Sequence, residues 1–271
     1  QPDVAVLNNV ALDHKSMDEL RRLFGDFARR AGRAIVNADN AEALALAGSN
    51  ATTFGFGENA DLRGTDLVER PDGVDFLAGG VRVCLNVPGR HNASNALAAL
   101  ATAEAVGIPI ADGAAGLAGF SGLRRRLELV GSRHGVTIID DFGHNPDKIG
   151  ATLDTLHAFP GRLLVMFQPH GYGPLKLMGN DLAATFRSRL GGDDRLFLPD
   201  PVYYGGTVDR SVGSDTLAQA IGAQASHCAS REDIADRLLA EARSGDRILI
   251  MGARDDTLSQ FARDILERLD G

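Results

Sequence analysis

The stretch that most constrains the fold is VTIIDDFGHNPDKI, residues 136–149. Its β-branched apolar start, residues 136–139, is typical of a short buried strand. The strand leads into two carboxylates, Asp140 and Asp141, and then into a glycine-containing turn that carries His144. The sequence thus places two acids and a histidine at the carboxyl end of a strand.

A helix is predicted directly after this turn. Asn145 is a suitable N-cap, Pro146 suits the first helical position, and apolar residues recur at helical spacing from Ile149 to Phe159. Open α/β sheets bind ligands at the carboxyl ends of their strands, and a helix N-terminus there favours phosphate. An ordinary capped helix with solvated acids explains the same residues equally well, so this stretch alone does not decide the function.

The remaining chain alternates short apolar runs with amphipathic segments, which predicts a mainly parallel, doubly wound α/β sheet. In residues 61–87, glycine-rich turns separate short alternating runs, and this pattern predicts an antiparallel meander. Residues 168–180 are expected to form a long loop. The predicted strands are 4–7, 34–37, 52–56, 136–139, 163–167, 196–198 and 248–251, and the predicted helices are 17–30, 41–47, 111–120, 147–158, 181–190, 215–224, 258–269 and a segment that begins at Ser230.

Two domains are expected, residues 1–122 and 123–271. The turn at 121–122 and the basic run at 124–126 that follows it are typical of a joint between domains.

Charge and composition exclude several classes of function. The net charge of -8 and the sequence pI near 5.3 argue against a general nucleic-acid-binding or anionic-membrane surface. No apolar run is long enough to span a bilayer. Cys84 and Cys228 lie far apart, without the spacing of a metal site or a disulfide framework. We therefore expect a cytoplasmic protein that binds neither nucleic acid nor membranes; its oligomeric state stays open.

NNVALDH, residues 8–14, is a candidate metal motif. It follows a predicted strand, so the Asp13 carboxylate and the His14 imidazole could meet a divalent cation. A helix-capping aspartate with a surface histidine is the more frequent explanation of such a pair, by about two to one.

GRHNASN, residues 89–95, is a candidate nucleotide motif. The amide side chains of Asn92 and Asn95 offer the donor and acceptor pair that matches the edge of adenine. Asn92, Ser94 or Asn95 could instead cap an Ala/Leu-rich helix that ends at Gly107, and for this motif taken alone capping is preferred.

Three further motifs lie in the second half of the chain. The basic run 124–126 could clamp a phosphate, since a guanidinium matches phosphate in a fork, although a solvated linker explains it equally well. FQPHGYG, residues 167–173, puts His170 at another strand end. MGARDD, residues 251–256, lacks the G-x-G-x-x-G spacing, so a Rossmann NAD site is not expected.

In this order, five motifs resemble those of the Mur ligase family, the ATP-dependent amide-forming enzymes of peptidoglycan synthesis. They are NNVALDH at 8–14, PGRHNASNALAA at 88–99, RRRLELVG at 124–131, IIDDFGHNP at 138–146 and FQPH at 167–170. The resemblance covers nearly the whole chain. Within the family, the chain looks most similar to the branch that acts on UDP-N-acetylmuramate. That branch includes the ligase that adds L-alanine and the recycling ligase that attaches L-alanyl-γ-D-glutamyl-meso-diaminopimelate.

The resemblance implies three domains: an N-terminal UDP-sugar domain, a central ATPase domain and a Rossmann-like C-terminal domain. No G-x-x-G-K-[ST] phosphate loop occurs in this sequence, and the chain opens with Gln1 directly before a strand. We therefore expect a piece of a longer ligase, in which residues 1–122 end the central domain and residues 123–271 form the C-terminal domain. This isolated chain is expected to be inactive.

Site roles follow from the resemblance, residue by residue. His14 matches a histidine that helps to hold a magnesium ion. Asn92 and Asn95 match the asparagines of the adenine-binding motif. The implied cofactors are ATP and Mg²⁺.

The residues that the resemblance implies in catalysis lie in the second half of the chain. Arg126 matches the interdomain arginine that reaches the transferred phosphate, and Asp141 and His144 match residues that close on the ribose and phosphates. In such enzymes the sugar carboxylate attacks the γ-phosphate of ATP to give an acyl phosphate, which the incoming amine then attacks. That chemistry needs charge neutralisation and positioning more than covalent catalysis.

The segment after FQPH bears on the amine substrate. Alanine-adding ligases carry arginines here that grip the amino-acid carboxylate, whereas this chain has Gly171, Gly173 and Pro174, with Lys176 as the only nearby cation. We expect His170 and Lys176 to contact the substrate, and the tripeptide to be favoured over L-alanine.

Two alternatives stay open. L-alanine could be the substrate if Arg187 or Arg254 supplies the missing cation from elsewhere in the fold. The chain could also be a non-catalytic protein that keeps a Mur-like scaffold for binding.

Overall fold

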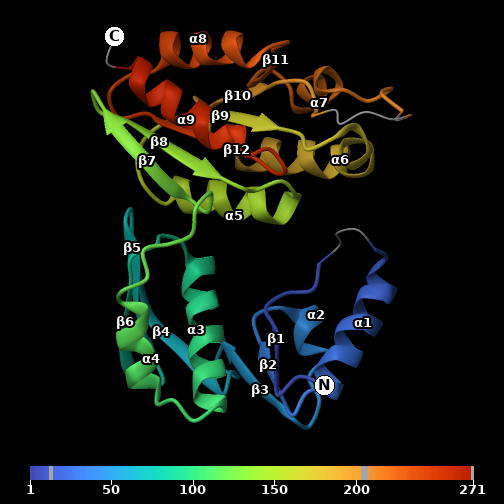
Figure 1. Ribbon diagram of the computed structural model, residues 1–271, viewed down its shortest axis with the longest axis vertical. Helices are drawn as coiled ribbons and strands as arrows, with labels where there is room; N and C mark the ends of the chain where they lie inside the picture. Colours follow the sequence, from blue (N-terminus) through green and yellow to red (C-terminus); the bar gives the residue numbers. More distant parts are fainter. Residues whose placement is uncertain (12–14, 203–206, 208, 270–271) are drawn as a thin grey trace. The chain divides into compact units, whose positions relative to one another are not determined.

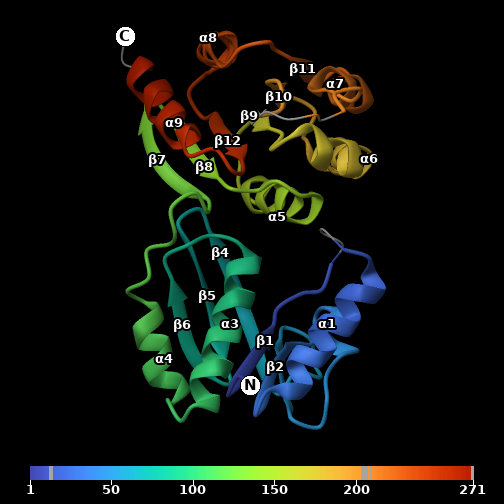
Figure 2. The same ribbon diagram turned by 45° about the vertical axis from the view of Figure 1, so that its right-hand side comes forward.

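The computed structural model describes residues 1–11, 15–202, 207 and 209–269. The chain forms two compact units, divided between Ser121 and Gly122 (Figures 1 and 2). Each unit has its own sheet and its own hydrophobic cores. None of the described helices is long and apolar enough to cross a membrane.

The sheet of the first unit runs in chain order from β1 to β6. β1 to β4 pair in parallel, and β4, β5 and β6 pair antiparallel, which confirms the meander predicted for residues 61–87. Gly79 and Gly80 adopt positive φ values of 55° and 84° in the tight turn between β5 and β6. The strands are β1 (Val4–Leu7), β2 (Arg33–Asn37), β3 (Ala51–Gly55), β4 (Leu62–Arg70), β5 (Gly73–Ala78) and β6 (Val81–Leu85).

Helices cover both faces of this first sheet. One core joins Phe54 of the sheet to Leu97 and Leu100 of α3, and α4 also packs there. The other core joins Val36 of the sheet to Ala43 of α2 and to one side of α1. The helices are α1 (Met17–Arg30), α2 (Ala41–Leu44), α3 (Arg90–Ala105) and α4 (Ile110–Leu117).

The sheet of the second unit has the order β11-β10-β9-β12-β8-β7. All neighbours pair in parallel except β7, which pairs antiparallel with β8 at one edge. This topology confirms the mainly parallel α/β sheet expected from the sequence. The strands are β7 (Glu128–Arg133), β8 (Val136–Asp141), β9 (Leu163–Gln168), β10 (Arg195–Leu198), β11 (Ala225–His227) and β12 (Arg247–Gly252).

Side chains of β9 alternate between two cores, as a strand buried on both faces requires. Leu163, Val165 and Phe167 face the core made with α5, α6 and α7, whereas Leu164 and Met166 face α8 and α9. Figure 1 shows α5 and α6 on one side of this sheet and α8 and α9 on the other. The helices are α5 (Pro146–His157), α6 (Tyr172–Arg189), α7 (Ser214–Ile221), α8 (Arg231–Glu241) and α9 (Thr257–Arg268).

The stretch from β8 to α5 folds as its sequence predicts. Asn145 caps α5, because its side-chain oxygen accepts a hydrogen bond from the Lys148 amide at 3.0 Å, and Pro146 occupies the first helical position. Ile149 and Leu153 are fully buried against the sheet, and burial of each such side chain stabilises the fold by about 1.5–3 kcal/mol.

α3 begins earlier than expected, so the prediction that Asn92, Ser94 or Asn95 caps it is wrong. The N-cap is Gly89, whose φ of 99° lets the chain turn into the helix before these residues. Asn92 instead donates its side-chain N–H to the Pro88 carbonyl at 2.8 Å.

α6 also begins earlier than expected. Residues 172–180, predicted as a loop, are helical, and α6 starts at Tyr172. The amides of the first turn have no partner inside a helix, so Gly173 and Pro174 cost little at these positions.

Two strands of the second unit carry weak sequence signals and were not predicted. β7 is a partly exposed edge strand whose register shifts between Leu129 and Gly131. β11 has only three residues, paired to β10 on one side.

Candidate active site

Three neighbouring strands of the second unit end side by side. β12 lies between β8 and β9 and runs parallel to both, so their carboxyl ends meet at one edge of the sheet. The register pairs Asp141 of β8 with Met251, and Gln168 of β9 with Gly252. Polar residues far apart in the sequence therefore gather at this edge, where α/β sheets bind ligands.

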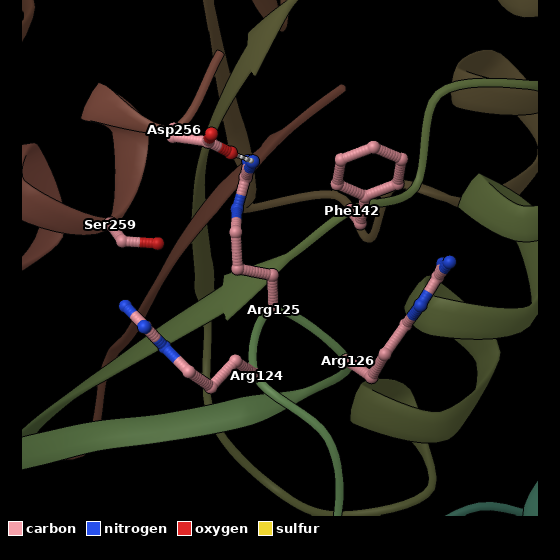
Figure 3. A pocket seen from close by; sticks show the side chains of 6 residues that line it. All are labelled: Arg124, Arg125, Arg126, Phe142, Asp256 and Ser259. Atoms are coloured by element: carbon pink, nitrogen blue, oxygen red, sulfur yellow. Dashed lines mark ion pairs between the residues drawn. The ribbon is translucent and has the colours of Figure 1, made fainter. Parts of the chain in front are cut away.

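The basic run lies beside this edge and borders a hollow of about 470 Å³. In Figure 3 its side chains diverge: Arg125 extends beside Phe142 toward Asp256, whereas Arg124 and Arg126 point to opposite sides. The hollow is lined by Arg124, Arg125, Arg126, Phe142, Asp256 and Ser259. Three guanidinium groups at one hollow suit an anionic ligand such as phosphate.

Arg125 is the inward member of the run, with a side chain only 9% exposed. Its two terminal nitrogens donate to the backbone carbonyls of Gly252 at 2.8 Å and Asp255 at 3.0 Å. Its Nε pairs with the Asp140 carboxylate at 3.4 Å, and its guanidinium lies 5.0 Å from the centre of the Phe142 ring. Arg125 thus joins the basic run to the ends of β8 and β12.

Arg126 has the opposite orientation and is exposed. Its guanidinium carbon lies 5.1 Å from the centre of the Phe142 ring, a cation–π contact that restricts the side chain. Of the two arginines that contact Phe142, Arg126 is therefore the one whose charge is accessible to a ligand in the hollow.

Asp140 is buried beneath the basic run, at 1% exposure. Burial raises the pKa of Asp140, and the hydrogen bond from Ser259 and the charge of Arg125 offset this only in part. The Ser259 hydroxyl donates to Asp140 at 2.6 Å, so the carboxylate connects β8 with α9.

Asp141, predicted to contact the nucleotide, is buried and has three donors within its own unit. It accepts hydrogen bonds from the amides of Leu127 at 2.9 Å and Gly143 at 2.8 Å, and from the Thr152 hydroxyl at 3.0 Å. This carboxylate therefore braces the basic run, the turn after β8 and helix α5.

The structure brings His144 and His170 together, although 26 positions separate them in the sequence. Their ring centres lie 5.1 Å apart in an edge-to-face arrangement. The Nδ1 atom of His144 is 2.9 Å from the Phe142 carbonyl oxygen, and His170 is buried. Because Phe142 also contacts Arg126, these two histidines and the arginine belong to one contiguous group at the sheet edge.

Lys176, predicted to bind the substrate, lies near the start of α6 and forms an ion pair with Asp209 at 2.5 Å. The hydrogen bond from Lys176 holds the pKa of Asp209 well below its usual range. Both side chains are more than half exposed. An exposed pair of this kind contributes little to the stability of the fold.

Arg187 and Arg254 are the other cations that the sequence offers for the amine substrate. Arg187 lies at the far end of α6, where it donates to the Ala220 carbonyl at 2.9 Å. Arg254 lies in the turn after β12, at the ligand edge, with a φ of 61°. An arginine that sequence reasoning did not single out, Arg210, lies 5.7 Å from the centre of the ring of Tyr172, the first residue of α6.

A second cluster at this edge was also missed from the sequence. Arg231 donates from Nε to the Gln168 side chain at 2.8 Å and from Nη1 to the Thr257 hydroxyl at 2.7 Å, and it pairs with Asp255. Burial tends to raise the pKa of Asp255, but hydrogen bonds from Thr257 and Arg231 outweigh it and lower that pKa. No local motif marks these residues, since the cluster joins three separate segments.

In the first unit, a chain of amides connects the predicted metal motif, residues 8–14, with the predicted nucleotide motif, residues 89–95. Asn8 donates to the Asn95 side-chain oxygen at 3.1 Å, and Asn37 donates to the Asn8 carbonyl at 2.9 Å. Asn95 in turn donates to Asn92 at 3.5 Å. Asn92 and Asn95 thus lie together in the first turns of α3, next to the end of β1.

His14, the predicted magnesium ligand, lies outside the described residues. Within residues 1–11, 15–202, 207 and 209–269, no three His, Cys, Asp or Glu side chains gather as a metal site.

The fold and this edge define an α/β protein with a cationic hollow suited to an anionic ligand. A family model described as the Mur ligase middle domain matches residues 1–103, and one described as the Mur ligase, glutamate ligase domain matches residues 125–254. The chain belongs to the Mur ligase family, which confirms the resemblance drawn from its motifs.

Known relatives agree with this assignment. The UDP-N-acetylmuramate–L-alanine ligase of Acidithiobacillus ferrooxidans is 35% identical, over 93% of this chain and 59% of that protein. In fold, the chain is similar to UDP-N-acetylmuramate–alanine ligase from Thermotoga maritima, with a TM-score of 0.73 and 20% identity over 99% of this chain and 60% of the other. A murein peptide ligase from Psychrobacter arcticus has a TM-score of 0.65 and 21% identity over 99% and 58%. The chain spans about three fifths of the length of these proteins.

Proposed function

We propose that the full-length protein carrying this chain is an ATP-dependent ligase that joins an amine to the lactyl carboxylate of UDP-N-acetylmuramate. Residues 1–122 would be the later part of its central ATP-binding domain, and residues 123–271 its C-terminal domain. Peptidoglycan synthesis or recycling is the process that such a reaction serves.

One observation carries this proposal: an exposed arginine is held at a cationic hollow on the carboxyl edge of a parallel sheet. Arg126 lies over Phe142, and Phe142 in turn contacts His144 at a ring-centre distance of 5.5 Å. An amide-forming reaction through an acyl phosphate develops charge on the transferred phosphoryl group. A pre-positioned guanidinium is suited to stabilise that charge.

ATP is the proposed energy source, as in the other Mur ligases. The amides of Asn92 and Asn95 in α3 offer donors and acceptors to the adenine edge. Asn95 donates to Asn92 and accepts from Asn8, and these hydrogen bonds restrict the orientation of both amide groups. Arg126 and His144 are proposed to meet the phosphates, and Asp141 to hold the turn on which His144 lies.

Magnesium would neutralise the phosphate charges. His14 is proposed as one of its ligands on the strength of the family motif alone.

For the amine, we favour the tripeptide L-alanyl-γ-D-glutamyl-meso-diaminopimelate. The first turn of α6, directly after His170, presents Tyr172, Gly173 and Pro174 and no cation. Lys176 follows, and its weak exposed pair with Asp209 can be exchanged for a substrate carboxylate.

L-alanine is the second candidate, and a specific observation favours it. Arg210 lies over the ring of Tyr172 at the start of α6, so a cation is present where sequence reasoning saw none. The curated relative from Acidithiobacillus ferrooxidans is, by its name, an L-alanine ligase.

The choice between these amines is testable with a substitution at Lys176. In the full-length protein, Lys176→Met is expected to raise the KM for the tripeptide by about tenfold, because one charge-assisted contact is worth about 1.5–3 kcal/mol. KM and kcat would come from phosphate release with UDP-N-acetylmuramate, ATP and magnesium.

Arg189→Ala is the matched control, since Arg189 forms a similarly exposed pair with Asp154 at the other end of α6. It should leave all constants unchanged. If L-alanine is used at least as efficiently as the tripeptide, and Arg210→Ala raises the KM for L-alanine, the second candidate is correct. If neither amine nor the muramate sugar stimulates phosphate release, the proposed function itself is wrong.

A further inference from the structure

We propose that Arg125 is a positioning residue: it locks the backbone beside it so that Arg126 faces the hollow in one fixed orientation. This inference rests on the proposed role of Arg126 at the transferred phosphate. It assigns to the neighbouring arginine a different task, carried out through its contacts with the protein.

The first support is the set of groups that the Arg125 side chain joins. Its guanidinium reaches the carbonyls of Gly252 and Asp255 in the turn after β12 and the buried carboxylate of Asp140 on β8. These partners belong to two strand ends, 15 to 130 positions away in the sequence. One planar side chain thus fixes the basic run to two neighbouring strands at once.

The second support is the backbone on either side of Arg126. Arg125 and Leu127 have φ values of 57° and 49°, in the left-handed region that side-chain-bearing residues rarely adopt. Such strain persists only where the surroundings over-determine the conformation, and it concentrates at functional sites. Arg126 is therefore held between two strained residues.

The third support is that the three backbone amides of this strained segment, residues 125–127, all donate to a partner. The Arg125 amide donates to the Glu128 carboxylate at 2.7 Å, and its carbonyl accepts from the Phe142 amide at 2.7 Å. The Leu127 amide donates to Asp141 at 2.9 Å, and the Arg126 amide donates to the Leu123 carbonyl at 3.2 Å.

This geometry explains why consecutive arginines point in different directions. With Arg125 directed inward and its backbone fixed, the next side chain must leave on the other side, against the Phe142 ring. A lysine at position 125 would keep the charge, but its single ammonium cannot span two carbonyls and a carboxylate as the planar guanidinium does.

The test compares Arg125 with a partly buried arginine of the same unit that lies away from the hollow. Arg162 precedes β9, at the amino edge of the sheet. It pairs with Asp246 at 2.6 Å and donates to the Glu241 carbonyl at 2.6 Å, with a side chain 18% exposed. Arg162→Met should thus disturb a similar set of interactions without moving Arg126.

In the full-length protein, Arg125→Met is expected to lower kcat by about 10–100-fold with little change in the KM for ATP, because a displacement of about 1 Å can cost a factor of 10². Arg162→Met should change kcat less than about twofold at a temperature where both variants are folded, as judged by circular dichroism. Arg125→Lys should recover thermal stability but not kcat.

A double-mutant cycle with Arg126→Ala identifies the route of the effect. If Arg125 acts through Arg126, Arg125→Met should lower kcat less than about threefold once Arg126 is already alanine. A full loss in that background, or equal kcat values for Arg125→Met and Arg162→Met, would overturn the inference while leaving the proposed function intact. If Arg126→Ala itself keeps the wild-type kcat, the proposed role of Arg126 fails, and this inference fails with it.

Discussion

Replacement of Arg126 by alanine in the full-length protein is expected to lower kcat by about 10²–10³, the usual effect of removing one group that stabilises charge in the transition state. Its thermal stability should be nearly unchanged, because Arg126 is exposed and its described contact is the ring of Phe142. Steady-state phosphate release with UDP-N-acetylmuramate and the amine gives kcat, and thermal unfolding gives the stability.

Arg263→Ala serves as the control for this substitution. Arg263 is an exposed arginine of the same unit, on α9, where it bonds the Gln260 side chain. Its removal takes away the same charge at a residue that does not line the hollow, so the kinetic constants should not change. Unchanged kinetics for Arg126→Ala as well would mean that Arg126 is only a solvated linker residue.

Residues 1–271 alone are expected to show no ligase turnover. The sequence contains no G-x-x-G-K-[ST] motif, so the backbone amides and the lysine that cradle the β- and γ-phosphates of ATP are not present in this chain. Phosphate release would be measured with this chain, ATP, magnesium, UDP-N-acetylmuramate and each amine, against the full-length protein at equal concentration.

The same comparison addresses the alternative that the protein is a non-catalytic Mur-like binder. Turnover by the full-length protein, and none by residues 1–271, supports the ligase. Muramate-dependent turnover by residues 1–271 alone would contradict the role given to the missing phosphate loop. Sugar binding without turnover in the full-length protein would favour the binder.

Local signals predicted much of the fold. The β-branched run at 136–139, the capping side chain of Asn145 and the proline at 146 act over a few residues, and they define β8 and α5 correctly. The same holds for α1, where Ser16 caps the helix by accepting from the Glu19 amide, and for the meander from β4 to β6.

The start of α6 could not be predicted by the same reasoning. Glycine and proline are common in loops, and this segment contains Gly171, Gly173 and Pro174. Over a short stretch of sequence their preferences therefore predict a loop and not a helix. In the structure, Leu175 and Met178 are buried in the core beneath the sheet, and this tertiary burial extends the helix back to Tyr172.

The sequence predicted which residues belong to the candidate site, and their roles there stay predictions; it did not predict which member of the basic run is buried. The motifs pointed to Arg126, Asp141 and His144. That Arg125 is buried follows from its hydrogen bonds to Gly252 and Asp255, about 130 positions away, and no local pattern encodes them. The cluster of Arg231 with Asp255 arises in the same way.

If the muramate carboxylate attacks ATP, one of its oxygens is transferred to the released phosphate, and isotope labelling detects this transfer. UDP-N-acetylmuramate labelled with ¹⁸O in its lactyl carboxylate would be converted by the full-length protein with ATP and the amine. An acyl phosphate forms when a carboxylate oxygen bonds to the γ-phosphorus and ADP leaves. When the amine then displaces phosphate from the acyl carbon, that oxygen departs with the phosphate. One ¹⁸O atom is expected in each phosphate released and one in the amide. Phosphate that carries no ¹⁸O from the sugar would contradict it.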